Sequence, residues 1–204
     1  MLQGIHWLGH ASVRIDDVIT IYIDPWKVAE PKQADLILVT HEHFDHLSKN
    51  DIAKLRGPET VVVASRGAAA KLPGEVKAVG PGERFEAAGV WVETVPAYNT
   101  NKPNHPRAAG HVGYVVELEG RRIYHAGDTD LIPEMADIRC DVAMLPVGGT
   151  YTMNAKQAAQ ALQVLQPQVA IPIHWGKLVG SKRDAKRFQS LAPEGVRVEI
   201  LDRE

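Results

Sequence analysis

The sequence lacks the features that mark several large classes of protein. It contains a single cysteine, Cys140, which excludes an internal disulfide and a zinc site built from several thiolates. No apolar segment approaches the ~20 residues that a membrane-spanning helix requires, and the first residues lack the charged and apolar regions of a signal peptide. We therefore expect a cytoplasmic protein with no membrane span.

A strong net charge is also absent. The 23 basic and 25 acidic residues are spread along the chain and give a formal net charge of -2. Proteins that bind nucleic acid through its phosphates normally carry a basic stripe or patch. The sequence therefore favours a small-molecule substrate over a nucleic-acid partner, and it leaves open the formation of a homo-oligomer.

Internal repeats, low-complexity segments and an interdomain linker are likewise missing. A chain of 204 residues with 45% hydrophobic content can bury one full core. We expect a single domain that covers residues 1–204.

Short apolar runs separated by turn residues predict a mixed α/β protein. The first three strands follow one another closely, which is typical of an antiparallel meander, whereas strands and helices alternate in the last third. Two sheets with outer helices fit this order. The expected strands are residues 5–8, 12–15, 18–23, 36–39, 60–64, 76–79, 84–86, 90–95, 112–118, 121–126, 141–145, 169–173 and 196–200, and the expected helices are 48–56, 65–72, 154–165 and 181–191.

Nine histidines are the anomaly of the composition, and potential metal ligands cluster in one short segment. The sequence THEHFDHL contains His41, His43, Asp45 and His46 directly after an apolar strand. These side chains therefore lie on a loop at the carboxyl end of a buried strand, where functional residues concentrate. Imidazoles and a carboxylate are ligands of zinc and similar ions. The alternative is a solvated polar loop that contains several histidines by chance. It does not explain the ligand-type residues that follow other strands of the sequence.

Further ligand-type residues also follow strands. Asp24 stands in IDPW, Asp128 in GDTD and His174 in IPIHWG, each at the end of an apolar run. The loop of residues 96–106 contains three prolines and three asparagines, and it carries His105. Such a loop is too polar for a core element, so we interpret it as part of an active site.

These segments resemble a known family. HEHFDH matches the HxHxDH signature of the metallo-β-lactamase superfamily, and its remote partners follow in that family's order. GHAS, IDPW, VGYVVEL and YHAGDTD are similar to the small hydrolases related to ascorbate-6-phosphate lactonase and to the phospholipase-D-like branch. The resemblance spans nearly the whole chain and implies an α/β protein with the four-layer αβ/βα sandwich of the metallo-β-lactamase fold.

The resemblance also implies a site for two divalent ions, with zinc as the first choice and manganese, iron or nickel as alternatives. The ions would activate a hydroxide that cleaves an ester, lactone or phosphodiester bond, and Asp45 would orient the water. A nucleic-acid phosphodiesterase of the same fold and a metal-binding protein without turnover are the alternatives. One ion would be held by His41, His43 and a third histidine and the other by Asp45, His46 and His174, with Asp128 as the bridge.

The third histidine of the first ion is where the sequence departs from the family's commonest pattern. Asn99 stands at the position where many members have that histidine, which leaves His105 and His111 as candidates. Residues 112, 114, 116 and 118 form the more apolar face of the following strand, so His111 lies with the other face and need not point inward. We therefore favour His105.

Other side chains are expected to support the site. Asp24 matches the family's early aspartate, and we expect it to accept an imidazole N–H and brace the histidine loop. His10, in GHAS, either lines the pocket or is satisfied by backbone groups, and His125 is expected to pack as a half-buried strand residue. Four more side chains flank the ligand loops and either shape a pocket or pack at its rim, namely Trp26, Asn99, Tyr151 and Trp175.

Three cations follow His174 in the sequence. They would favour an anionic substrate if they faced the site, and otherwise they form a solvated helix face. They are Lys177, Lys182 and Arg183.

Overall fold

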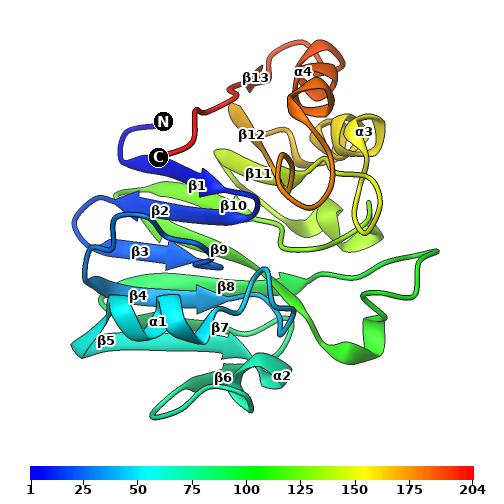
Figure 1. Cartoon of the computed structure of the whole chain (residues 1–204). Coiled ribbons are helices and arrows are strands. Elements are labelled where there is room, and N and C mark those ends of the chain that lie inside the picture. Colours follow the sequence, from blue (N-terminus) through cyan, green and yellow to red (C-terminus); the bar gives the residue numbers. More distant parts are fainter.

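Two β-sheets face each other in the computed structural model, which describes residues 1–204. Helices lie on the outer side of each sheet, and the two chain ends lie close together (Figure 1). This arrangement confirms the mixed α/β sandwich that the sequence predicts. None of the helices combines the length and the apolar character that a membrane crossing requires.

The first sheet has six strands in chain order. Its first three strands pair antiparallel, as expected for a meander, and the others pair in parallel. The strands are β1 (Ile5–Gly9), β2 (Ser12–Asp16), β3 (Thr20–Ile23), β4 (Ala34–Val39), β5 (Arg56–Ser65) and β6 (Lys77–Val79).

The second sheet has seven strands, also in chain order. The first four pair antiparallel, and the last four form a parallel set. The strands are β7 (Arg84–Ala87), β8 (Val90–Pro96), β9 (Val112–Leu118), β10 (Arg121–His125), β11 (Val142–Pro146), β12 (Val169–Ile173) and β13 (Arg197–Val198).

Four α-helices and two short 3-10 helices complete the fold. Ser48, Ser65, Asn154 and Ser181 precede the four α-helices as N-caps, as the sequence predicts. The helices are α1 (Lys49–Leu55), α2 (Arg66–Ala69), α3 (Ala155–Leu165) and α4 (Lys182–Ser190), with η1 (Arg107–Ala109) and η2 (Pro133–Asp137).

Strand β4 shows how the layers are held together. Leu36 and Leu38 belong to the large core between the sheets, whereas Ile37 and Val39 belong to a second core beneath α1 and α2. Because successive side chains of a strand point to opposite faces, a continuous apolar run is what a strand buried on both faces needs. The apolar run before the histidine loop therefore places β4 inside the molecule.

Several predicted boundaries are wrong. The helix expected over residues 65–72 ends at Ala69, and Lys71 and Leu72 instead donate backbone hydrogen bonds three residues back, as in a tight turn. The strand expected from residue 18 begins at Thr20, and Val18 is 64% exposed in the preceding turn. The strand expected over residues 60–64 already begins at Arg56, and the one expected over 196–200 is only Arg197–Val198. None of these changes moves a candidate ligand.

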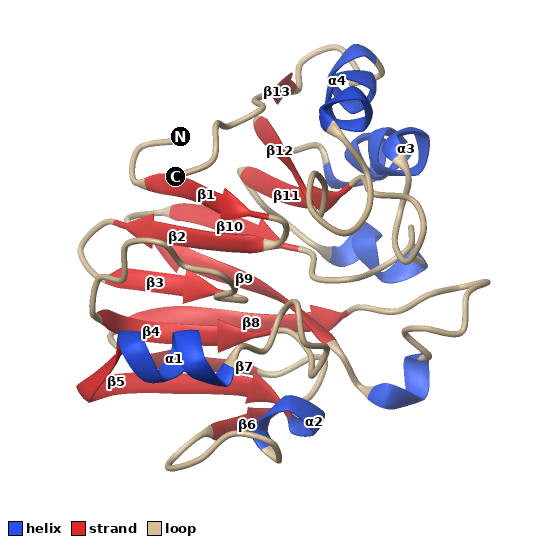
Figure 2. Cartoon of the chain, in the orientation of Figure 1, coloured by secondary structure: helices blue, strands red, loops and turns tan.

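The carboxyl ends of the parallel strands lie at one edge of the sandwich. The arrowheads of β3, β4 and β8 point toward the side where the long loops gather (Figure 2). Parallel strands present their carboxyl ends at the same edge of a sheet, so loops distant in sequence meet there. The fold thereby collects the ligand-type residues that the sequence scatters.

A pair of buried tyrosines tests the packing between the sheets. Both rings are fully buried, but the Tyr114 hydroxyl donates to the Val39 carbonyl at 2.9 Å, whereas the Tyr124 hydroxyl has no partner. Tyr114→Phe leaves a buried carbonyl without this donor and should lower the free energy of unfolding by about 1–2 kcal/mol. Tyr124→Phe removes an unpaired hydroxyl and should cause no loss. Urea denaturation of both variants checks this, and equal losses would contradict the assignment of the hydrogen bond.

Candidate metal centre

Six segments supply the polar side chains at this edge of the sandwich. They are the turn between β1 and β2 and the loops that follow β3, β4, β8, β10 and β12. Their candidate residues are His10, Asp24, the HEHFDH loop, His105, Asp128 and His174, in that order.

Three imidazoles form a first cluster. The Nδ1 atom of His43 lies 3.1 Å from Nε2 of His41 and 3.1 Å from Nε2 of His105. All three nitrogens lie within 4.8 Å of one another. Donor atoms that share one zinc-like ion at about 2.1 Å lie roughly 3–4 Å apart. The three nitrogens are therefore spaced as the ligands of a single ion.

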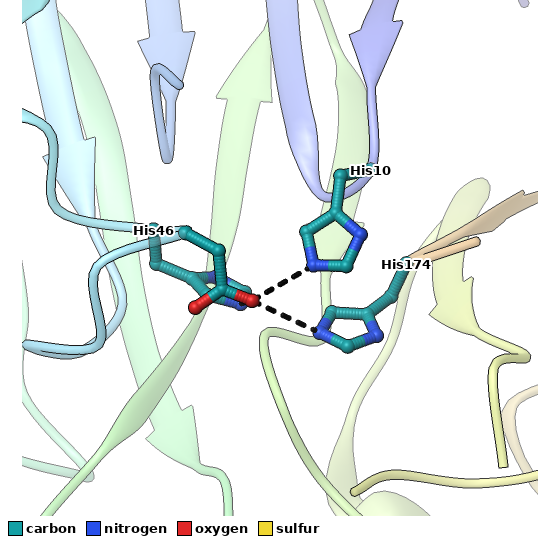
Figure 3. Close-up of side chains that lie close together, drawn as sticks. His10, His46 and His174 are labelled. Carbon is teal, nitrogen blue, oxygen red and sulfur yellow. Dashed lines mark hydrogen bonds and ion pairs between the residues drawn. The ribbon is translucent and has the colours of Figure 1, made fainter. Parts of the chain in front are cut away.

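A second cluster contains His10, Asp45, His46 and His174, whose donor atoms also lie within 4.8 Å of one another. Oδ2 of Asp45 lies 2.9 Å from Nε2 of His10 and 3.9 Å from Nε2 of both His46 and His174. In Figure 3 the three labelled rings come from separate segments and turn toward a common centre, and dashed lines join His10 and His174 to one carboxylate oxygen.

Asp128 lies between the two clusters. Its Oδ2 atom is 3.4 Å from Nε2 of His105 in the first cluster and 3.0 Å from Nε2 of His174 in the second. Its Oδ1 atom is 3.3 Å from Nε2 of His46. The side chain is only 4% exposed. This carboxylate therefore faces donor atoms of both clusters.

Oxygen acceptors fix the orientation of the buried rings. Nδ1 of His46 lies 2.7 Å from Oδ2 of Asp24, and Nδ1 of His105 lies 3.0 Å from Oδ1 of Asn99. Nδ1 of His41 lies 2.9 Å from the Thr40 hydroxyl. Each of these nitrogens donates its N–H outward, so Nε2 of each ring faces the cluster and is the atom that would bind a metal ion.

The Thr40 hydroxyl accepts that hydrogen bond because it donates its own proton to Asp24. Its Oγ1 lies 2.6 Å from Oδ2 of Asp24, and the backbone N–H of Thr40 donates to Oδ1 at 2.7 Å. Asp24 is fully buried. One carboxylate therefore orients His46 directly and His41 through Thr40.

Three of the site residues adopt the left-handed backbone region, which is uncommon for residues other than glycine. The φ angles of His10, Asp24 and His174 are 55°, 49° and 58°. Such conformations cost on the order of 1–3 kcal/mol each and persist only where the surroundings impose them. The backbone N–H of His174 donates to the His10 carbonyl at 2.7 Å, and that of Asp24 donates to the Leu38 carbonyl at 2.9 Å.

The carboxylates of the site are held in the charged form. Burial raises the pKa of Asp45, but the hydrogen bond from His10 and the nearby His46 outweigh it and hold the pKa at about 2. Burial likewise raises the pKa of Asp128, yet His174 and His46 lower it well below its usual value. The site therefore concentrates negative charge where little solvent reaches.

The imidazoles respond to burial and to these carboxylates. Burial lowers the pKa of His10 and His41, and it lowers that of His105 to about 4. Burial also lowers the pKa of His46, but Asp128 and Asp24 outweigh it and raise the value well above normal. Neutral imidazole is the form that binds metal. The raised pKa of His46 shows that the carboxylates of Asp128 and Asp24 favour a positive charge at this position.

Buried polar atoms without hydrogen-bond partners indicate that these residues fit metal ions. Nε2 of His46, Nε2 of His174 and Oδ1 of Asp128 are buried and have no hydrogen-bond partner. Buried polar atoms are normally satisfied, and a cation in their midst would satisfy all of them. The nitrogen and oxygen donor set suits zinc and also manganese, iron or nickel.

The clusters form the floor of a cavity of about 380 Å³. Its floor is polar, whereas its rim carries three large apolar or aromatic side chains. The lining residues are His43, Phe44, Asp45, Asn104, His105, Asp128, Tyr151 and Leu178.

Some predicted positions supply no donor atom to either cluster. The buried ring of His111 lies beside the first cluster, with its centroid 4.8 Å from that of His41, but its Nε2 lies 3.4 Å from Glu42 and belongs to neither cluster. His125 is fully rather than half buried and donates through Nε2 to the Ala11 carbonyl at 2.8 Å. Trp175 stacks on Trp7 in the core, with ring centroids 4.4 Å apart. Sequence reasoning missed the role of Thr40, for which no motif position gave a signal.

Comparison with known proteins identifies the family of the chain. A family model described as the beta-lactamase superfamily domain matches residues 4–174. A UPF0173 metal-dependent hydrolase of Thermus thermophilus is 36% identical over 209 residues, which cover 93% of this chain and 91% of the relative. A protein of the same description from Pyrococcus abyssi is 34% identical over 215 residues, which cover 97% of this chain and 95% of that protein.

Solved structures show the same fold. The crystal structure of a protein from Parabacteroides distasonis superposes with a TM-score of 0.87 at 34% identity, covering 98% of this chain and 93% of the other. The metallo hydrolase Igni18 from Ignicoccus hospitalis superposes with a TM-score of 0.77 at 23% identity, covering 97% and 94%, and so shares the fold. The chain thus belongs to the metallo-β-lactamase superfamily and is a metal-dependent hydrolase of that fold.

Proposed function

We propose that this hydrolase uses two divalent ions, zinc as the first choice, to cleave an ester, lactone or phosphodiester bond in a small molecule. The observation that carries the proposal is the position of Asp128, whose carboxylate faces His105 of one ligand cluster and His46 and His174 of the other. A shared carboxylate is what a pair of neighbouring ions requires.

Seven side chains would hold the ions. The ions, once bound, would supply Lewis-acid chemistry that activates water and stabilises negative charge on the substrate. The ligands of the first ion would be His41, His43 and His105, those of the second would be Asp45, His46 and His174, and Asp128 would serve both.

Asp45 has a second role in this proposal. His10 is neutral because burial lowers its pKa, so its Nε2–H donates to Oδ2 of Asp45 at 2.9 Å and fixes the direction of the carboxylate. A carboxylate fixed in this way can accept a hydrogen bond from the attacking water and orient it toward the substrate. His10 therefore acts as a positioning residue through Asp45.

A metal-binding protein without turnover is less well supported. His43, Asp45, His105 and Asp128 all line the cavity, so a substrate can reach donor atoms of both clusters. A purely structural metal site is normally closed by its protein ligands, whereas catalytic sites keep a position open. The open cavity favours catalysis.

The first prediction for this site concerns the number of ions. Apo protein that is reloaded with zinc should bind close to two ions per chain, because two donor clusters share Asp128. Elemental analysis after removal of loosely bound metal measures this. His6→Ala, which removes a histidine that pairs with Glu204 away from the site, serves as the control and should still bind two. Saturation at one ion would reject the dinuclear site.

The second prediction separates the two candidate histidines. His105→Ala should lose one ion and most of the hydrolytic activity, because its Nε2 lies 3.1 Å from Nδ1 of His43. His111→Ala should retain both ions, since Nε2 of His111 lies 3.4 Å from the carboxylate of Glu42 and belongs to neither donor cluster. Metal titrations of both variants, with thermal unfolding to monitor the fold, decide between them. Loss of an ion in the His111 variant alone would reverse the assignment.

The third prediction concerns Asp24, which accepts hydrogen bonds from both Thr40 and His46. In Asp24→Asn the amide oxygen would stay with the Thr40 N–H, and the amide NH₂ would face Nδ1 of His46. Nδ1 of His46 must then accept a hydrogen bond from the amide. The ring would carry its proton on Nε2, the nitrogen that faces the metal site. The affinity of the second ion should fall by about 10- to 100-fold.

Competition with a chelator measures that affinity. Asp51→Asn is the matched control, because Asp51 is also buried and accepts from a backbone N–H, that of Lys27, outside the site. If both variants bind the second ion as tightly as the parent protein, Asp24 does not orient a ligand.

A further inference from the structure

The rim of the cavity carries exposed apolar side chains from three separate segments. Phe44 is 67% exposed, Tyr151 is 41% exposed and Leu178 is 47% exposed. They account for three of the eight exposed large hydrophobic residues of the molecule, and all three line the one cavity. Single exposed hydrophobic residues need no explanation, but a group around a ligand site indicates what the site binds.

No cationic side chain lines this cavity. Its only charged residues are Asp45 and Asp128, which belong to the metal clusters. Lys177 precedes Leu178 but lies at a separate small depression beside Trp26. Sites for phosphate esters normally offer arginine, lysine or a helix N-terminus to the anion. The negative charge of an anionic substrate would be balanced by the metal ions alone.

Lys182 and Arg183 do not supply the missing charge. Both are exposed on α4 and neither lines the cavity, and Lys182 lies 3.9 Å from Asp202. Both residues therefore belong to a solvated helix face, which is the alternative that the sequence leaves open for them.

Two of the three rim residues are held next to loops that carry candidate ligands. Phe44 lies between His43 and Asp45 in the chain, so the loop that carries ligands of both clusters also presents its ring. That ring meets Trp26 edge-on, with centroids 6.3 Å apart. On the opposite segment, Nδ2 of Asn99 donates to the Tyr151 carbonyl at 2.8 Å. Asn99 also accepts from His105, so Tyr151 is tied to a ligand loop.

We propose that the substrate is an uncharged carboxylic ester or lactone whose hydrocarbon group packs against Phe44, Tyr151 and Leu178 while its carbonyl lies over the metal clusters. This inference rests on the proposed hydrolytic function and narrows it. Water adds to the carbonyl carbon, the acyl C–O bond breaks, and the alkoxide leaves with a proton from that water, which gives an acid and an alcohol.

A binding experiment tests the rim without requiring turnover. The zinc-loaded protein is titrated by calorimetry with n-alkyl hydroxamates from acetohydroxamate to octanohydroxamate, which chelate metal and extend a hydrocarbon tail. Each methylene that reaches the rim should tighten binding about three- to fourfold. Affinity that does not rise with chain length would overturn the inference.

A turnover experiment tests the preference for uncharged substrates. The series runs from 4-nitrophenyl acetate to octanoate, with bis(4-nitrophenyl) phosphate as an anionic substrate that has the same leaving group. The ratio of kcat/KM for octanoate to that for acetate should exceed 10 and should fall severalfold in Phe44→Ala and Leu178→Ala. Leu191→Ala, which removes an exposed hydrophobic residue that does not line the cavity, should keep the ratio.

The outcomes separate this inference from the proposed function. Preference for the phosphodiester, or an unchanged ratio in both rim variants, would overturn the apolar substrate while leaving the hydrolase intact. Absence of hydrolysis for all substrates, together with hydroxamate affinity that rises with chain length, would reject the proposed bonds and support the apolar rim.

Discussion

A single buried carboxylate orients much of the metal centre. Asp24 accepts hydrogen bonds from the backbone and the hydroxyl of Thr40 and from the ring of His46. Because the hydroxyl of Thr40 gives its proton to Asp24, it must accept from His41. Two imidazoles from the same loop thereby turn their Nε2 atoms inward, and the position of that loop depends on a residue outside it. An ion-binding site needs this support, because imidazole rings are free to rotate without it.

The backbone around Asp24 explains how that carboxylate reaches the loop. Asp24 follows β3, which pairs in parallel with β4, so the carboxyl ends of the two strands lie side by side. A left-handed φ of 49° turns the chain at Asp24, and its N–H pairs with the Leu38 carbonyl. His10 and His174 share this unusual conformation. Residues other than glycine in this region cluster at functional sites, where the rest of the fold imposes the strain.

The sequence predicts most of the helices and strands, because each depends on a local pattern. The apolar run before HEHFDH is a strand buried on both faces, and the caps of the four helices stand where the sequence places them. The wrong boundaries, such as those at Val18 and at Ala69, lie at the ends of elements that are themselves present. Such ends are the part of an element that local sequence defines least.

The supporting contacts could not be predicted, because they join residues that are remote in sequence. The asparagine that replaces the usual histidine was recognised as a departure, yet nothing in the sequence indicated that Asn99 would accept from the backbone N–H and the ring of His105. Asn99 therefore still contributes to the site, as a hydrogen-bond partner of the candidate ligand His105. A similar limit applies to the cavity rim, since Phe44, Tyr151 and Leu178 meet only in the folded chain.

The cavity has a charged floor and an apolar rim, and each kind of surface is stabilised by a different kind of group. The floor holds two charged carboxylates in a buried place, which is costly unless cations compensate them. The rim exposes hydrocarbon to water, which becomes favourable once another apolar group covers it. Because Phe44 lies in the chain between ligands from the two clusters, no separate element is needed to bring the apolar rim to the metal floor. The HEHFDH loop therefore contributes candidate ligands to both clusters and one side chain to the apolar rim.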